Sequence, residues 1–233
     1  MNVASLLLDV LFPPECVACG VRIGRDALCS SCRIGITSHR TAFCGTCAAP
    51  LPGLRSICHP QAPYLLGAAG RYGDPSLRAL IHALKFERVR SAAGPLADIL
   101  AQYCARLPID FRGMEVVPMP ISRARMRERG FNQSVLIAER FARFFGMPLA
   151  ADLLVRHTDR PPQSEIADRD ARRANVHGCY AVKKECNGAA CAIPRKVILV
   201  DDVTTSGATF FEAASALKAA GVKKIFALAA AKA

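Results

Sequence analysis

The apolar positions of the chain follow different patterns on the two sides of residues 60–63. Beyond that point, short apolar runs typical of buried strands alternate with stretches in which apolar side chains recur every three or four residues. Because strands that alternate with helices favour parallel pairing, we predict an α/β fold with a mostly parallel sheet flanked by helices. The predicted strands are 64–72, 116–120, 197–200 and 225–230, and the predicted helices are 75–86, 94–107, 131–145 and 210–220.

The segment before residue 60 has no comparable pattern. From Cys16 to Pro63 it consists of turns rich in Gly, Pro and Cys, which is typical of a small module held together by metal. We therefore predict two domains, residues 1–62 and 63–233. The first residues have neither the basic start nor the cleavage site of a signal peptide, and no apolar run reaches the ~18 residues of a membrane span. We expect a cytoplasmic protein without a membrane span.

Two Cys-x2-Cys pairs predict a zinc site near the N-terminus. Cys16 and Cys19 form the first pair, and Cys29 and Cys32 form the second. Each pair can place two thiolates on one cation, and together they complete a closed, tetrahedral structural zinc site. The alternative is a disulfide framework, which requires an oxidising compartment.

A second group of cysteines is less complete. It contains Cys44, Cys47 and Cys58, and no further cysteine completes another Cys-x2-Cys pair. A closed zinc site needs four ligands, so the fourth has to be His59 or His39. His59 directly follows Cys58, and we predict a second zinc site at Cys44, Cys47, Cys58 and His59.

The formal net charge of +12 restricts the choice of ligand. Arginines and lysines cluster within residues 123–129, 169–173 and 183–196. Such clusters suit a polyanion, either a pyrophosphate-bearing substrate or a nucleic-acid backbone, and charge alone does not distinguish the two. Aromatic residues make up only 6% of the chain and Trp is absent, which argues against a dedicated single-strand binder because such proteins stack bases on aromatic rings.

Residues 197–209 carry the strongest chemical signal. An apolar strand delivers Asp201 and Asp202, and ligands of open α/β sheets collect at the carboxyl ends of such strands. We expect both carboxylates to point into a crevice and to accept hydrogen bonds from two ribose hydroxyls. A solvated acidic pair before a helix cap, or a metal-binding acidic pair in another nucleotide fold, is the alternative. The following loop offers hydroxyls and close backbone approach to a phosphate at the start of a helix. Its residues are Thr204, Thr205, Ser206, Gly207, Ala208 and Thr209.

This run resembles the motif with which type I phosphoribosyltransferases bind 5-phosphoribosyl 1-pyrophosphate (PRPP). Together with the cysteine pairs, it makes the whole chain similar to the ComF family, in which an N-terminal double zinc ribbon precedes a type I phosphoribosyltransferase domain. Other runs that carry the resemblance are Leu84-Lys85-Phe86, Val117-Pro118-Met119-Pro120, Arg127-x-Arg129-Gly130-Phe131-Asn132-Gln133, Thr158-x4-Gln163 and Arg172-x2-Asn175.

The resemblance implies a role for each run. Asp201 and Asp202 would be the catalytic acids that hold the ribose hydroxyls, with Mg²⁺ shared between ribose and pyrophosphate, and residues 204–209 would hold the 5′-phosphate. A flexible loop containing Gln163, Arg172 and Asn175 would close over the site. The residues expected to contact PRPP or its phosphates are Lys85, Pro118, Met119, Pro120, Arg125, Arg127 and Arg129.

The resemblance also implies a function. It is glycosyl transfer from PRPP, or binding of a related sugar phosphate, linked to DNA uptake in natural competence. The sequence identifies no acceptor nucleophile and leaves open whether catalysis is retained. The alternative is a catalytically silent protein that binds single-stranded DNA through its phosphate-binding face and works with the DNA-uptake machinery.

Overall fold

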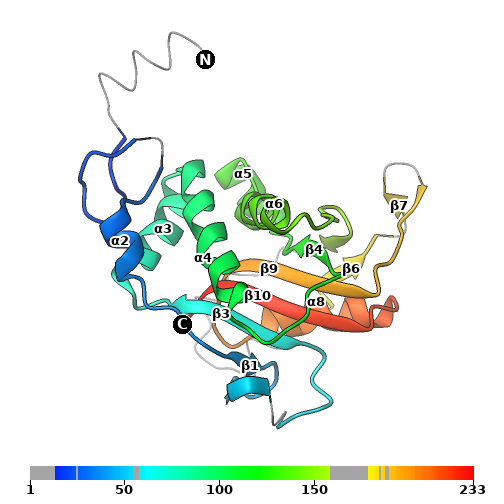
Figure 1. The fold of residues 1–233 in the computed structure, drawn as a ribbon. Coiled ribbons are helices and arrows are strands. Elements are labelled where there is room, and N and C mark those ends of the chain that lie inside the picture. Colours follow the sequence, from blue (N-terminus) through cyan, green and yellow to red (C-terminus); the bar gives the residue numbers. More distant parts are fainter. Residues whose placement is uncertain (1–13, 25, 55–57, 158–177, 184, 187–188) are drawn as a thin grey trace.

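A six-stranded sheet with the strand order β2-β1-β3-β10-β9-β4 forms the centre of the molecule (Figure 1). The computed structural model describes residues 14–233 except 25, 55–57, 158–177, 184 and 187–188. Strands β3, β10, β9 and β4 are parallel, whereas β1 and β2 are antiparallel, so the predicted α/β fold is confirmed. The strands are β1 (Ala42–Cys44), β2 (Pro50–Leu51), β3 (Leu65–Arg71), β4 (Glu115–Pro118), β9 (Lys196–Thr204) and β10 (Lys224–Lys232).

Helices cover both faces of this sheet. In Figure 1, α3, α4 and α6 lie on one face and α8 lies on the other. Side chains of β9 alternate between the two layers: Ile198 and Val200 pack in the core with α3, α4 and α6, and Val197 and Leu199 pack in the core with α8. The helices are α3 (Pro75–Phe86), α4 (Ala93–Ala105), α6 (Gln133–Phe145) and α8 (Ala208–Ala219).

Local sequence signals explain why these elements begin where they do. Asp74 caps α3, because its side chain accepts hydrogen bonds from the amides of Ser76 and Leu77. Pro75 occupies the first turn of that helix, where its missing N–H costs nothing. The predicted helix over 75–86 and the strand at 64–72 therefore match α3 and β3 closely.

The Cys-rich segment contributes to the same sheet and the same core. Strand β1 pairs antiparallel with β3, where Phe43 lies opposite Leu66. Cys16, Leu28 and Ile36 are buried in the core that also contains α3 and α4. A division into residues 1–62 and 63–233 remains a prediction, since one continuous core joins the two parts.

Several short elements did not emerge from the apolar pattern. They contain few residues or are dominated by charged side chains, so they leave no clear periodicity. These short elements are α2 (Ser30–Gly35), η1 (Pro52–Leu54), η2 (Arg90–Ala92), α5 (Arg123–Arg129), β5 (Leu154–Arg156), β6 (Tyr180–Val182), β7 (Glu185–Cys186) and β8 (Ala189–Ala190).

Among the described residues, no helix is both long and apolar enough to cross a membrane.

Candidate functional site

Four cysteine sulfurs come together at the first predicted zinc site. The Sγ atoms of Cys16, Cys19, Cys29 and Cys32 all lie within 4.8 Å of one another. Those of Cys19 and Cys29 are 3.8 Å apart. Four sulfurs at about 2.3 Å from a tetrahedral zinc ion lie about 3.8 Å from each other. The cluster therefore has the size of a closed structural zinc site.

Backbone amides donate hydrogen bonds to sulfurs of this cluster. The Cys29 N–H donates to Cys16 Sγ at 3.4 Å, and the Cys32 N–H donates to Cys29 Sγ at 3.4 Å, where Cys29 caps α2. Burial disfavours the Cys16 thiolate, but hydrogen bonds from the amides of Cys29, Ala18 and Cys19 outweigh burial and lower the pKa of Cys16 to about 6. Because the thiolate is the ligand, this lowering favours Cys16 as a ligand near neutral pH, whereas the side chains of Cys29 and Cys19 raise the pKa of Cys32 to about 12.

The second cluster has a histidine as its fourth member. His59 Nδ1 lies 3.5 Å from Cys44 Sγ and 3.3 Å from Cys58 Sγ. The alternative ligand, His39, instead packs edge-on against the ring of Phe43. All four ligand atoms lie within 4.8 Å of one another, which is the arrangement that a second zinc site requires. The members are Cys44, Cys47, Cys58 and His59.

The two adjacent acids lie inside β9 rather than beyond its end. The two carboxylates have different nearest partners, which lie on α6 for Asp201 and on α3 for Asp202. Asp202 is only 3% exposed, and its Oδ2 lies 2.9 Å from Lys85 Nζ on α3. The contact is an ion pair without the alignment of a hydrogen bond. Lys85, which we expected to contact phosphate, thus neutralises Asp202.

Asp201 is half-buried and uses one carboxylate oxygen for both of its hydrogen bonds. The Ser134 hydroxyl donates to Oδ1 at 2.8 Å, and the Asp202 N–H donates to the same atom at 2.9 Å. Among the described residues, Oδ2 has no hydrogen-bond partner. Burial, and then the negative charge of Asp202, raise the pKa of Asp201 above its usual range. A cation or a hydroxyl donor would stabilise the ionised form, so Asp201 is the acid that remains available to a ligand.

The segment 129–134 links two helices to the loop after β4. Arg129, expected to contact phosphate, is 7% exposed and donates to Gln133 Oε1 at 2.8 Å. Gly130 ends α5 with a φ of 78°, a conformation that glycine adopts without strain. Asn132 caps α6, and its Nδ2 donates to the Met119 carbonyl at 2.9 Å. Arg129, Gly130, Asn132 and Gln133 therefore have structural roles in joining α5, α6 and the loop after β4.

The turn after β9 opens α8 as the sequence predicts. Gly207 stands at the helix N-terminus with a φ of 76°, and the Tyr64 hydroxyl donates to its carbonyl at 3.2 Å. The Thr205 side chain is exposed, and Ser206 and Thr209 are half-buried. The turn therefore combines accessible hydroxyls with the positive end of a helix, which suits a phosphate group.

The other predicted contacts differ in their exposure. On α5, Arg127 is exposed and Arg125 is half-buried, and Pro120 is half-buried after β4. Buried members of the predicted set are Pro118, Met119, Thr204 and Ala208. The predictions for Gln163, Arg172 and Asn175 fall outside the described residues.

Two residues of the site were not found from the sequence. Ser134 is 67 positions from its partner Asp201, and Tyr64 is 143 positions from Gly207. No local pattern connects such distant positions, because only the tertiary fold brings α6 to β9 and Tyr64 to the turn before α8. The one local signal for Ser134 was its position in the first turn of the helix that Asn132 caps.

Substitution of Gly207 by alanine tests the geometry of this turn. An added Cβ would lie 2.8 Å from the Tyr64 hydroxyl, and alanine disfavours the left-handed conformation by about 1–2 kcal/mol. We expect Gly207→Ala to lower the free energy of unfolding by at least that amount in urea denaturation. Gly73→Ala is the matched control, because nothing lies within 4 Å of its added Cβ. Equal stability of the two variants would contradict the strained turn.

The cysteine clusters and the sheet define the class of protein. The chain is an α/β protein that carries an N-terminal, Cys-rich structural zinc module. Residues 7–60 match the double zinc ribbon domain family.

Similarity to characterised chains extends beyond that module. The chain is 28% identical over 221 residues to Competence protein F of Haemophilus influenzae, covering 91% of this chain and 93% of that protein. It is 29% identical over 201 residues to DNA utilization protein YhgH of Salmonella typhi, covering 82% and 83% of the two chains. The YhgH protein of Escherichia coli strain K12 is 28% identical over 206 residues, which cover 84% and 86%. These matches confirm the resemblance to the ComF family that the sequence indicates.

Proposed function

We propose that the carboxyl end of β9 and the turn at residues 204–209 bind the ribose 5-phosphate part of PRPP. The observation that carries this proposal is that Oδ2 of Asp201 has no hydrogen-bond partner among the described residues, on the strand that leads into the glycine turn and a 12-residue helix. A ribose hydroxyl can donate to that oxygen, and amides at the start of α8 can donate to the phosphate. Ser134 would be a positioning residue, because it fixes the orientation of the Asp201 carboxylate through Oδ1.

Asp201 and Asp202 take different roles in this proposal. Asp201 meets the sugar, whereas Asp202 anchors the strand through its ion pair with Lys85. Arg125 and Arg127 on α5 are the accessible cations for pyrophosphate, since Arg129 is already bonded to Gln133. The pyrophosphate would lie beside the loop after β4, where parallel pairing brings β4 next to β9.

The residues present fit Mg²⁺ if the protein supplies only a small share of its ligands. Mg²⁺ often uses one or two carboxylates and takes its other ligands from substrate phosphates and water. Oδ2 of Asp201 would supply one such ligand, while Asp202 is engaged by Lys85. When bound, the ion would neutralise charge on the pyrophosphate.

The chemistry that follows is phosphoribosyl transfer. The bond between C1′ and the pyrophosphate oxygen breaks, the pyrophosphate leaves with the bonding electron pair, and an acceptor forms the new bond to C1′. Arginines and amides held in fixed positions stabilise the leaving negative charge.

The relatives support a biological role in the handling of DNA. Their names, Competence protein F and DNA utilization protein, suggest that this chain also acts in DNA uptake or use. A cytoplasmic location is part of the proposal and is supported by the two thiolate-rich clusters, which need reduced cysteines.

One surface favours a second function, the binding of single-stranded nucleic acid. Phe86 and Met126 are 59% and 43% exposed, unusual for large apolar side chains, and Arg129 lies over the Phe86 ring at 5.7 Å. Arg88 and Arg127 are exposed near these side chains, on the same two helix ends. An aromatic ring among arginines can stack a base while cations contact the backbone.

Calorimetric titration with PRPP and Mg²⁺ distinguishes the two functions. We expect Asp201→Asn to weaken PRPP binding at least about tenfold, because it removes a charged hydrogen-bond acceptor. Binding of a single-stranded oligonucleotide should stay intact in this variant and should fall with salt. The control is Asp152→Asn, an exposed acid with only a 3.8 Å contact to Lys183. Equal PRPP affinity of both variants, or no PRPP binding by the folded wild-type protein, would refute the proposal.

A further inference from the structure

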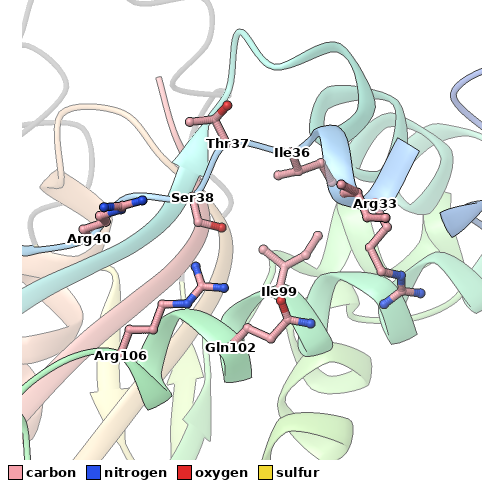
Figure 2. A pocket seen from close by; sticks show the side chains of 9 residues that line it. Arg33, Ile36, Thr37, Ser38, Arg40, Ile99, Gln102 and Arg106 are labelled. Carbon is pink, nitrogen blue, oxygen red and sulfur yellow. The ribbon is translucent and has the colours of Figure 1, made fainter. Parts of the chain in front are cut away.

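A cavity of about 430 Å³ lies between the segment that follows α2 and the second half of α4 (Figure 2). None of its lining residues belongs to the proposed PRPP site. Its wall includes Arg33, Ser38, Arg40, Ile99, Gln102 and Arg106. Cavities that hold small ligands have volumes of roughly 300–1,000 Å³, so this one has room for a molecule of nucleotide size.

The cavity has an excess of positive charge. Arg33 is paired with Asp26 at 2.6 Å and with Asp98 at 2.7 Å, so its charge is neutralised. Arg40 and Arg106 form no ion pair with any described residue, and no carboxylate lines the cavity. Two guanidinium groups thus line one cavity without a counter-charge from its wall.

The backbone directs specific donors into this space. Residues 38–40 are extended along β3: Ser38 forms a bridge with Gly70, and the His39 N–H donates to the Ala69 carbonyl at 2.8 Å. Alternation therefore places Ser38 and Arg40 on one side and His39 on the other, against Phe43. Figure 2 shows the Arg106 guanidinium directed toward Ser38, and the Gln102 side chain one turn earlier on α4.

The geometry points to a binding site for a terminal phosphate, that is, a phosphate monoester carried by a mononucleotide-sized ligand. A monoester is close to a dianion at neutral pH, so it matches two unpaired guanidinium groups better than the singly charged diester of a nucleic-acid backbone. Arg40 and Arg106 hold the phosphate, and the Ser38 hydroxyl and Gln102 amide donate further hydrogen bonds. Ile36 and Ile99 give the ligand an apolar wall.

The ligand has two sources with the same chemistry, a free 5′-mononucleotide and the 5′-phosphorylated end of a short single strand. The probes are deoxyadenosine 5′-monophosphate, deoxyadenosine, and a trinucleotide with either a 5′-phosphate or a 5′-hydroxyl. Binding of the mononucleotide but not of deoxyadenosine is expected. If the trinucleotide with a 5′-phosphate binds more tightly than the one with a 5′-hydroxyl, the ligand is a strand end. If the mononucleotide binds and neither trinucleotide does, the ligand is the free mononucleotide.

Paired variants locate the binding. We expect Arg40→Ala with Arg106→Ala to weaken mononucleotide binding by about 100-fold, because two charge-assisted hydrogen-bonding groups are lost. Both side chains are exposed, so the fold should be retained. Arg140→Ala with Arg143→Ala is the control, since it removes the same charge from exposed positions of α6. The Asp201→Asn variant should bind the mononucleotide normally, which separates this site from the proposed PRPP site.

Three results would overturn the inference. They are the absence of mononucleotide binding to the wild-type protein, an equal loss of binding in the control pair, and equal affinity for the two trinucleotides with no binding of the mononucleotide. The last result would show recognition of backbone diesters instead of a terminal phosphate.

Discussion

Removal of zinc is expected to unfold the N-terminal module and to lower the melting temperature of the whole protein by roughly 10 °C or more. Metal binding supplies most of the folding free energy of small zinc modules. Loss of zinc should also destabilise the rest of the protein, because Cys44 lies on β1 and Cys16 is buried in the core shared with α3 and α4. Metal analysis of the reduced protein should give two zinc ions per chain, one for each cluster. Scanning calorimetry with and without a chelator measures the change.

Substitution of a single zinc ligand tests the same role of zinc without a chelator. Cys19 is exposed, so Cys19→Ser removes a zinc ligand without leaving a cavity in the core. Ala18→Ser introduces the same hydroxyl at the neighbouring exposed position and should leave the melting temperature unchanged. A chelator-treated protein that melts like the untreated one would contradict a structural role for zinc.

Loss of the Lys85 ammonium is expected to lower the free energy of unfolding by about 3 kcal/mol. Lys85→Met keeps most of the apolar volume but leaves the buried Asp202 carboxylate without its closest counter-charge. Removing one partner of a buried ion pair typically costs about 3–5 kcal/mol. The nearby Arg129 interacts favourably with Asp202, which places the expectation at the lower end of this range. Urea denaturation measures the effect.

A second substitution separates the buried charge from lost packing. The double variant Lys85→Met with Asp202→Asn should recover part of the lost stability, because no uncompensated carboxylate remains. Lys223→Met, at an exposed position, should change stability by less than about 0.5 kcal/mol. If the double variant is less stable than Lys85→Met alone, the ion pair is not the cause.

Much of the fold follows from local patterns in the sequence. The helix over 75–86 carries its own cap and apolar face, and the strand–turn–helix at 197–219 carries apolar residues, a glycine and a helical repeat in order. Paired cysteines at short spacing likewise predict a zinc site, because two adjacent turns can supply four ligands. The second set predicted from the sequence, with His59 as its fourth ligand, also comes together in the structure.

The details of the acidic site did not follow from the sequence. Strand β9 continues through Asp201 and Asp202, whereas the apolar run in the sequence ends before them. Partners of these acids come from α3 and α6, and only the packing of helices on the sheet brings Lys85 and Ser134 to them. Likewise, the pairing of β1 with β3 joins the zinc module to the sheet through only a few residues, which leave no periodic signal.

The central claim is that the carboxyl end of β9 and the following turn bind phosphorylated ribose. The most direct test is a titration of isotope-labelled protein with ribose 5-phosphate and Mg²⁺, followed through the backbone amide resonances. We predict saturable shifts at residues 205–209 and at Asp201, and their loss in the Asp201→Asn variant. Saturable shifts confined to other parts of the protein, or none at all, would contradict the claim.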